Sequence, residues 1–133
     1  MINKSKKILT EISAGELLDK ISILEIKLDK IKDKGSLIEI NKEYTSLSET
    51  KNSNISITKD LENLTKQLKE TNTKLWSIED EKRMCEKNKD FGKKFIELAR
   101  SVYLNNDKRA KIKSEINKLL GSNIKEIKKY INY

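Results

Sequence analysis

The residues best suited to chemistry lie between positions 70 and 110, where the chain places its arginines and its single tryptophan. Lysine is the common cation of this sequence, so an arginine indicates that the planar, bidentate guanidinium matters at its position. Such groups bind carboxylates and phosphates through paired hydrogen bonds. Polar and aromatic residues accompany them. The candidate ligand-binding residues are Trp76, Glu79, Asp80, Arg83, Arg100, Tyr103, Asn106, Asp107 and Arg109.

Two interpretations of these residues are open. In the first, the charged side chains form an ion-paired layer that fixes the register of two packed helices. In the second, Arg100, Tyr103, Asn106 and Arg109 line a pocket for an anionic ligand. A closed layer in which every arginine is paired would favour the first interpretation. An open pocket beside an unpaired Arg100 or Arg109 would favour the second.

The spacing also predicts which residues face each other. If two antiparallel helices are joined by a turn near residue 90, facing residues have numbers that sum to about 180. The predicted neighbours are Arg83 with Glu97, Asp80 with Arg100, Trp76 with Tyr103 or Leu104, Asn72 with Asn106 and Asp107, and Arg109 with Glu70 and Thr71.

Several other chemistries find no support. The chain has no histidine, which excludes histidine-based acid–base catalysis and the usual zinc ligands. Cys85 is the only cysteine, so it cannot form a disulfide within the chain. We therefore expect no metal and no cofactor. The sequence Asp90-Phe91-Gly92 matches the magnesium motif of protein kinases, but no glycine-rich loop accompanies it, and a turn between helices explains it better.

Composition limits the class of protein. Apolar residues make up 35% of the chain and charged residues 38%, a balance typical of helices with one narrow buried stripe. The net charge is +8, but the lysines are interleaved with acidic residues, and Lys, Ile and Asn are all favoured by an AT-rich genome. We therefore do not expect a nucleic-acid partner. No stretch is long and apolar enough for a membrane span or a signal peptide, so we expect a cytoplasmic protein.

Apolar spacing and capping residues predict an all-α protein with one helical domain over residues 1–133. Ser13 and Glu16 form a capping box that begins the first helix, and Gly35 ends it. A second capping box at Ser36 and Glu39 begins the next helix. The predicted elements are an N-terminal arm over 1–12, helices over 13–34, 36–47, 57–88 and 91–120, a loop over 48–56, and a C-terminal tail over 121–133.

Short connections make neighbouring helices antiparallel, which predicts two helical hairpins. These hairpins form either a four-helix bundle or an extended antiparallel coiled coil. Ile23 and Ile26 lie outside the heptad pattern of the first helix, so this side contacts either the terminal segments or a second copy of the chain. In the second case the partner is another copy of the chain, in a homo-oligomer.

Six segments carry a resemblance to a known family: Ser13–Lys27, Leu75–Asp80, Phe91-Gly92, Glu97–Tyr103, Asn106–Ala110 and Gly121-Ser122. Together they resemble a family of short bacterial all-helical proteins of about this length and of unknown function. The resemblance covers nearly the whole chain and names no chemistry. Genes of such proteins often accompany genes for surface polysaccharides, which the resemblance implies for this chain as well.

The function that the sequence favours is that of a non-enzymatic helical interaction or scaffold protein that self-associates. The alternative is a protein that binds or transforms a small phosphorylated or carboxylated metabolite through the arginine-rich layer. Helical enzymes with Arg, Lys and Glu in their pockets exist, but a shared fold class is only an analogy.

Overall fold

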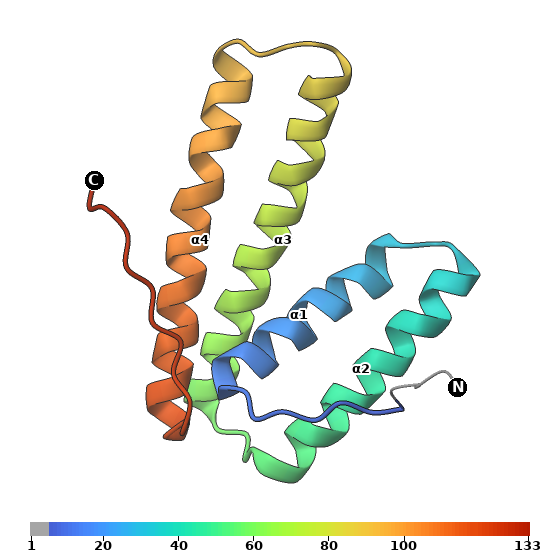
Figure 1. The fold of residues 1–133 in the computed structure, drawn as a ribbon, viewed down its shortest axis with the longest axis vertical. Coiled ribbons are helices and arrows are strands. Elements are labelled where there is room, and N and C mark those ends of the chain that lie inside the picture. The colour runs from blue at the N-terminus through green and yellow to red at the C-terminus, as the bar shows by residue number, and fades with distance from the viewer. Residues whose placement is uncertain (1–5) are drawn as a thin grey trace, which may run out of the picture.

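The computed structural model describes residues 6–133, which form four helices. They are α1 (Ala14–Lys30), α2 (Lys34–Asn54), α3 (Lys59–Lys87) and α4 (Lys93–Leu120). Figure 1 shows two antiparallel hairpins, α1–α2 and α3–α4, which confirms the predicted all-α fold class. The first hairpin lies across the lower part of the second, and the upper end of α3–α4 extends beyond it.

Local capping signals account for most helix ends. The Ser13 hydroxyl accepts a hydrogen bond from the Glu16 amide at 3.1 Å, and Thr58 caps α3 in the same way by accepting from the Leu61 amide at 3.2 Å. At the other end, Gly121 has φ 61°, the left-handed conformation that commonly ends a helix. The predicted bounds of the third and fourth helices therefore agree with the structure to within two residues.

The boundary between α1 and α2 differs from the prediction. Helix α1 ends at Lys30, and Asp33 caps α2 by accepting hydrogen bonds from the amide and the hydroxyl of Ser36 at 2.8 and 2.7 Å. Gly35 consequently lies in the first turn of α2, where it ends no helix. The prediction failed because Asp33, an equally good capping residue, precedes the Ser36 box and begins the helix earlier.

The predicted loop over 48–56 is also wrong, because α2 continues to Asn54. The half-buried positions Leu47, Lys51 and Ile55 keep a spacing of four residues through this polar stretch. The aliphatic stem of a lysine can cover apolar surface while its ammonium group stays in water, so Lys51 continues the buried stripe. The hydropathy pattern alone therefore did not predict the last two turns of α2.

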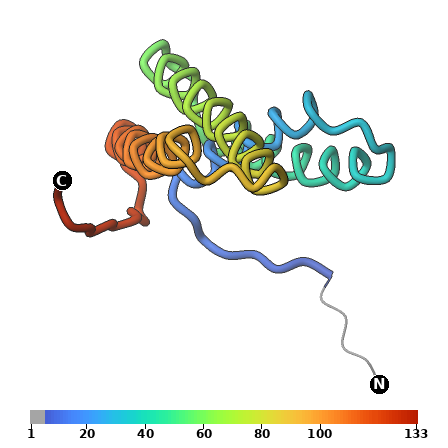
Figure 2. Tube along the Cα trace, turned by 90° about the horizontal axis from the view of Figure 1, so that it is seen from above, coloured from blue at the N-terminus to red at the C-terminus, as the bar shows by residue number. Residues whose placement is uncertain are grey.

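Helix α1 is the central element of the bundle. It packs against α2, α3 and α4, whereas α2 contacts no other helix of the described chain than α1. Figure 2 shows α2 displaced to the side of the α3–α4 pair. None of the residues of α2 is fully buried. The main apolar core therefore lies where α1 meets the lower parts of α3 and α4, and it contains Leu17, Leu18, Ile21, Leu61, Leu68, Ile112 and Ile116.

The segments outside the helices lie on the surface. Residues 6–12 form no helix, and Ile8 and Leu9 in this arm are exposed. The predicted arm over 1–12 falls partly outside the described residues. Residues 123–133 also lack regular secondary structure and run back along α4 (Figure 1).

Candidate functional site

A buried ion pair joins the two hairpins. Asp19 of α1 is 1% exposed, and its Oδ1 accepts a hydrogen bond from Nε of Arg109 at 2.8 Å, while its Oδ2 accepts from Nη2 of the same guanidinium. The Nδ2 group of Asn72 donates to Asp19 Oδ1 at 2.9 Å and to the Ser22 hydroxyl at 2.7 Å. Ser22 in turn donates to the Asp19 carbonyl at 3.0 Å. Three helices thus meet at one carboxylate.

The environment keeps Asp19 ionised. Burial by itself raises the pKa of Asp19, but the hydrogen bonds from Arg109 and Asn72 and the positive charges of Arg109 and Lys113 outweigh it. The pKa of Asp19 therefore lies below its ordinary value of 3.8. The hydrogen bond with Asp19 raises the pKa of Arg109. A permanently charged pair of this kind suits a structural role, since neither group exchanges a proton near neutral pH.

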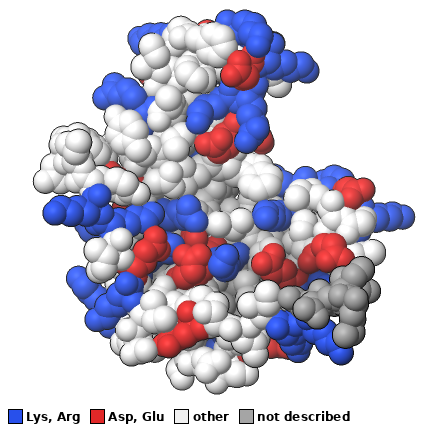
Figure 3. Space-filling view, viewed as in Figure 1, with Lys and Arg blue, Asp and Glu red and all other residues white. Residues whose placement is uncertain are grey.

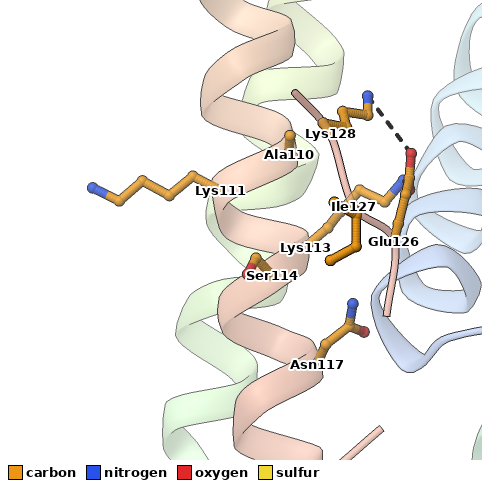
Figure 4. Close-up of a pocket in the computed structure, with 8 residues that line it drawn as sticks. All are labelled: Ala110, Lys111, Lys113, Ser114, Asn117, Glu126, Ile127 and Lys128. Atoms are coloured by element: carbon orange, nitrogen blue, oxygen red, sulfur yellow. Dashed lines mark hydrogen bonds and ion pairs between the residues drawn. The ribbon is translucent and has the colours of Figure 1, made fainter. Parts of the chain in front are cut away.

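A second cation lies beside this pair. The side chain of Lys113 is 9% exposed, and its Nζ donates to Glu16 Oε2 at 2.7 Å and to Glu126 Oε2 at 3.1 Å. Burial lowers the pKa of Lys113, but the hydrogen bonds to both carboxylates outweigh this effect, so the pKa lies above its ordinary value. The hydrogen bond from Lys113 in turn lowers the pKa of Glu126. In Figure 4, Glu126 lies beside Lys113 and Lys128, while Lys111 points away.

The close approach of α1 to α4 depends on Gly15. A Cβ atom at this position would lie 2.6 Å from the Lys113 carbonyl oxygen, closer than real contacts allow. The first amides of α1, which have no partner within the helix, bond to α4 and to the segment after it. The Gly15 amide donates to Asn117 Oδ1 at 2.7 Å, and the Ala14 amide donates to the Ser122 hydroxyl at 3.1 Å. These bonds position Asp19 against α4.

A groove of about 450 Å³ opens beside the Asp19–Arg109 pair, between α1, α3 and α4. It combines apolar walls with polar groups, as ligand sites do. Both residues that were predicted to contact a second copy line it, and Ile26 is only 4% exposed, so it packs within the single chain. The lining residues are Ile23, Ile26, Asn72, Leu75, Trp76, Glu79, Asp80, Arg83, Val102, Asn106 and Arg109.

The described chain leaves some polar groups of this groove without partners. Asn72 is 5% exposed, and because the Asp19 carboxylate can only accept, Nδ2 of Asn72 faces it and Oδ1 faces away. No residue of 6–133 donates to that oxygen. Every fully buried side-chain oxygen of the described chain has a hydrogen-bond partner, so Oδ1 is not fully buried and is accessible from the groove that Asn72 lines. Arg109 Nη1 makes only a 3.5 Å contact with Asn106 Oδ1.

The predicted site residues gather in two adjacent places. Trp76, Glu79, Asp80 and Arg83 line the groove together with Asn106 and Arg109. Tyr103 and Asp107 line a second cavity, between α4 and residues 128–133, which also includes Asn106 and Arg109. Arg100 is exposed and lines neither.

The predicted pairings within the layer are wrong. Arg109 binds Asp19, where Glu70 and Thr71 were expected, and Glu97 pairs with Lys93 at 3.8 Å. Within residues 6–133 neither Arg83 nor Arg100 forms an ion pair.

The spacing rule placed Asn72 near Asn106, and both residues line the groove. The rule treats two helices alone, however, and the hydrogen-bond partners of Asn72 are Asp19 and Ser22 of α1. Tyr103 packs against Tyr133 with ring centroids 5.3 Å apart. Helix α1 and the C-terminal segment supply these partners.

Sequence reasoning missed the small and polar residues of α1. Gly15, Asp19 and Ser22 follow each other at spacings of four and three residues, which places them on one helix face, and all are buried. A small or polar residue repeated at heptad spacing inside an apolar helix indicates a buried polar contact, and this signal was present. The partner Lys113 carried no such signal, because it lies in a lysine-rich run.

The remaining surface gives no single-sign charged face in the view of Figure 3, where Lys and Arg are mixed with Asp and Glu. No helix among the described residues has an apolar stretch that could cross a membrane. The described Cys, Asp and Glu side chains form no group of three that could hold a metal ion.

Comparison with known proteins identifies the family without giving an activity. No curated protein and no solved structure shows significant similarity to the chain. A family model described as "Family of unknown function (DUF6165)" matches residues 8–132. This range contains both hairpins, the buried ion pair and the groove. The chain therefore belongs to this family of unknown function.

Proposed function

We propose that the protein binds a small anionic molecule with an apolar body in the groove between α1, α3 and α4. The observation that carries this proposal is the set of unpartnered polar groups beside apolar walls. Asn72 Oδ1 can accept a hydrogen bond, while Asn106 Nδ2 and Arg109 Nη1 can donate. A carboxylate or phosphate monoester fits the two donors, and leaving them unpaired in a filled groove would cost binding free energy. Asn72 Oδ1 can accept only from a hydroxyl or N–H group elsewhere on the molecule, because these anions carry no donor when fully ionised.

The two arginines of the groove differ in net charge. The charge of Arg109 is countered by Asp19, so its free edge offers hydrogen bonds and little net charge. Arg83 at the rim is exposed and forms no ion pair within the described chain, whereas Glu79 is paired with Lys82 at 3.5 Å. Arg83 would therefore attract an anion to the groove, and the anionic group would lie at the donors of Asn106 and Arg109. The apolar body would lie against Trp76 and Ile23.

Trp76 provides a direct test, because it is the only tryptophan and lines the groove. Its fluorescence would be titrated with benzoate, phenyl phosphate and the neutral analogue benzyl alcohol. We expect saturable changes with the two anions and weaker binding of the alcohol. Absence of a saturable response to either anion would refute the proposal.

A matched pair of variants locates the binding. Asn106→Leu removes a donor from the groove, and we expect it to weaken benzoate binding about ten-fold, the value of one charge-assisted hydrogen bond. Asn105→Leu is the control, because Asn105 is half-buried, donates to the Ser101 carbonyl at 2.8 Å and does not line the groove. Equal effects of both variants would place the binding elsewhere.

Self-association is a second candidate, favoured by the end of the α3–α4 hairpin that extends beyond α1 (Figure 1). Met84, Phe91 and Ile96 there are 54%, 49% and 55% exposed. Two helices are half of a four-helix bundle, so the hairpin of a second copy could cover them. The unpaired Arg100 could then meet an acidic residue of the other hairpin.

Light scattering tests this second candidate. Ile96→Glu should reduce the solution mass from that of a dimer to that of a monomer. Ile38→Glu, at a position of α2 that is 66% exposed, is the control and should leave the mass unchanged. A monomeric wild-type protein would refute self-association.

A further inference from the structure

The C-terminal segment, residues 123–133, runs antiparallel to α4 (Figure 1). Near its start, Glu126 accepts a hydrogen bond from Lys113 at 3.1 Å. At its end, the Tyr133 hydroxyl donates to Asp107. Polar contacts thus hold the segment along α4 at both ends.

Between these contacts the C-terminal segment and α4 border an open cavity of about 900 Å³, which we call the C-terminal cavity. Little apolar surface holds the segment down, since Ile127 and Ile131 are 86% and 92% exposed. A ligand could therefore enter by displacing few contacts. The lining residues are Val102, Tyr103, Asn106, Asp107, Arg109, Lys128, Lys129, Tyr130, Ile131 and Tyr133.

The chemistry of the C-terminal cavity is cationic and aromatic. Lys128 is exposed and its Nζ forms an ion pair with Glu126 Oε1 at 3.7 Å, while Lys129 forms no ion pair within the described chain. The carboxylate of Asp107, the only acidic residue in the lining, is already bonded to Tyr133. Ammonium groups bind phosphates strongly as compact point charges.

The C-terminal cavity adjoins the groove. Both are lined by Val102, Asn106 and Arg109, which follow each other at spacings of four and three residues along one face of α4. A molecule bound in the groove at Asn106 therefore lies next to the cavity. A dianionic group on that molecule could extend past Asn106 toward the two lysines.

We propose that the ligand of the groove is a phosphate monoester, and that Lys128 and Lys129 of the C-terminal segment bind its phosphate. This inference rests on the proposed binding in the groove. It makes the segment part of the binding site and selects phosphorylated over carboxylated molecules, because a phosphate monoester carries up to two negative charges near neutral pH and a carboxylate carries one.

The test compares two probes with one apolar body, phenyl phosphate and benzoate, by isothermal titration calorimetry and Trp76 fluorescence. The variant Lys128→Ala/Lys129→Ala removes the proposed phosphate contacts from a surface segment. The control Lys66→Ala/Lys74→Ala changes the net charge equally at two exposed positions of α3 that line neither site.

We expect wild type to bind phenyl phosphate about ten-fold more tightly than benzoate, and the Lys128/Lys129 variant to lose this preference. Benzoate affinity should stay within about two-fold in both variants, since its contacts lie in the groove. Binding of both probes without preference, or a preference that survives the variant, would overturn this inference and leave the groove proposal intact. If neither probe binds, both proposals fail.

Discussion

Arg109 of α4 donates hydrogen bonds through Nε and Nη2 to the two carboxylate oxygens of Asp19, which lies ninety residues earlier on α1. This bidentate contact connects the two hairpins at the edge of the apolar core. It also sets the orientation of the guanidinium, whose Nη1 edge is left facing Asn106 and the groove. The buried pair and the groove are thus parts of one arrangement.

Asp19→Ala should destabilise the fold by about 3–5 kcal/mol, because it leaves Arg109 partly buried without its carboxylate. Asp29→Ala is the control, since Asp29 lies on the same helix and is exposed; it should change stability by less than about 0.5 kcal/mol. Urea denaturation followed by circular dichroism measures both. Similar losses in the two variants would contradict a stabilising role for the pair.

Replacing both Asp19 and Arg109 should lower the free energy of unfolding by less than the sum of the two single replacements. Arg109→Leu leaves the Asp19 carboxylate buried without its partner, whereas Asp19→Leu/Arg109→Leu removes both charges and adds apolar volume. We expect a favourable coupling of about 2–3 kcal/mol in a double-mutant cycle of unfolding free energies. Additive effects would show that the two residues act independently.

Acidification should destabilise the protein through Asp19 and Glu126. Hydrogen bonds hold the folded pKa of each carboxyl below its ordinary value, 3.8 for Asp19 and 4.5 for Glu126. Such groups contribute stability that is complete above the unfolded pKa and is lost as the pH falls through the folded pKa. The unfolding free energy should therefore decline below pH 4.5, where the unfolded chain begins to take up protons that the folded chain does not.

A comparison with Asp19→Asn isolates the buried carboxyl. The variant lacks the titrating group, so its unfolding free energy should decline less steeply with falling pH than that of wild type. The difference between the two proteins should shrink below pH 3.8. A constant difference from pH 7 to pH 3 would show that the pKa of Asp19 is not lowered by folding.

Two glycine substitutions should have opposite effects. Gly15→Ala forces a Cβ to within 2.6 Å of the Lys113 carbonyl and should cost about 1–3 kcal/mol. Gly35→Ala lies in the first turn of α2 with no neighbouring atom closer than 3.6 Å, so it should stabilise the protein by about 0.5–1 kcal/mol. Thermal melts of both variants measure these changes: Gly15→Ala should lower the Tm and Gly35→Ala should raise it. A higher Tm for Gly15→Ala would refute the close packing of α1 on α4.

Local signals in the sequence determined the fold class and most helix ends. Ser13 and Gly121 each act within one turn of chain, so their effects follow from neighbouring residues alone. Leu61, Leu68, Ile78 and Cys85 of α3 are buried and follow each other at spacings of seven, ten and seven residues, a pattern that predicts one apolar helix face from the sequence alone. The extension of α2 past Leu47 was missed because it depends on Lys51, whose stem is apolar although its type is charged.

Tertiary structure alone decided the partners of the polar residues. The sequence singled out Arg109, Trp76 and Asn106 by type, and spacing on one hairpin gave Arg109 the wrong partner. Its true partner depends on where α1 crosses α3 and α4, and this crossing is set by close packing at Gly15. Residue spacing encodes which face of a helix is apolar, but contacts between distant helices depend on how their surfaces fit, which no short stretch of sequence contains.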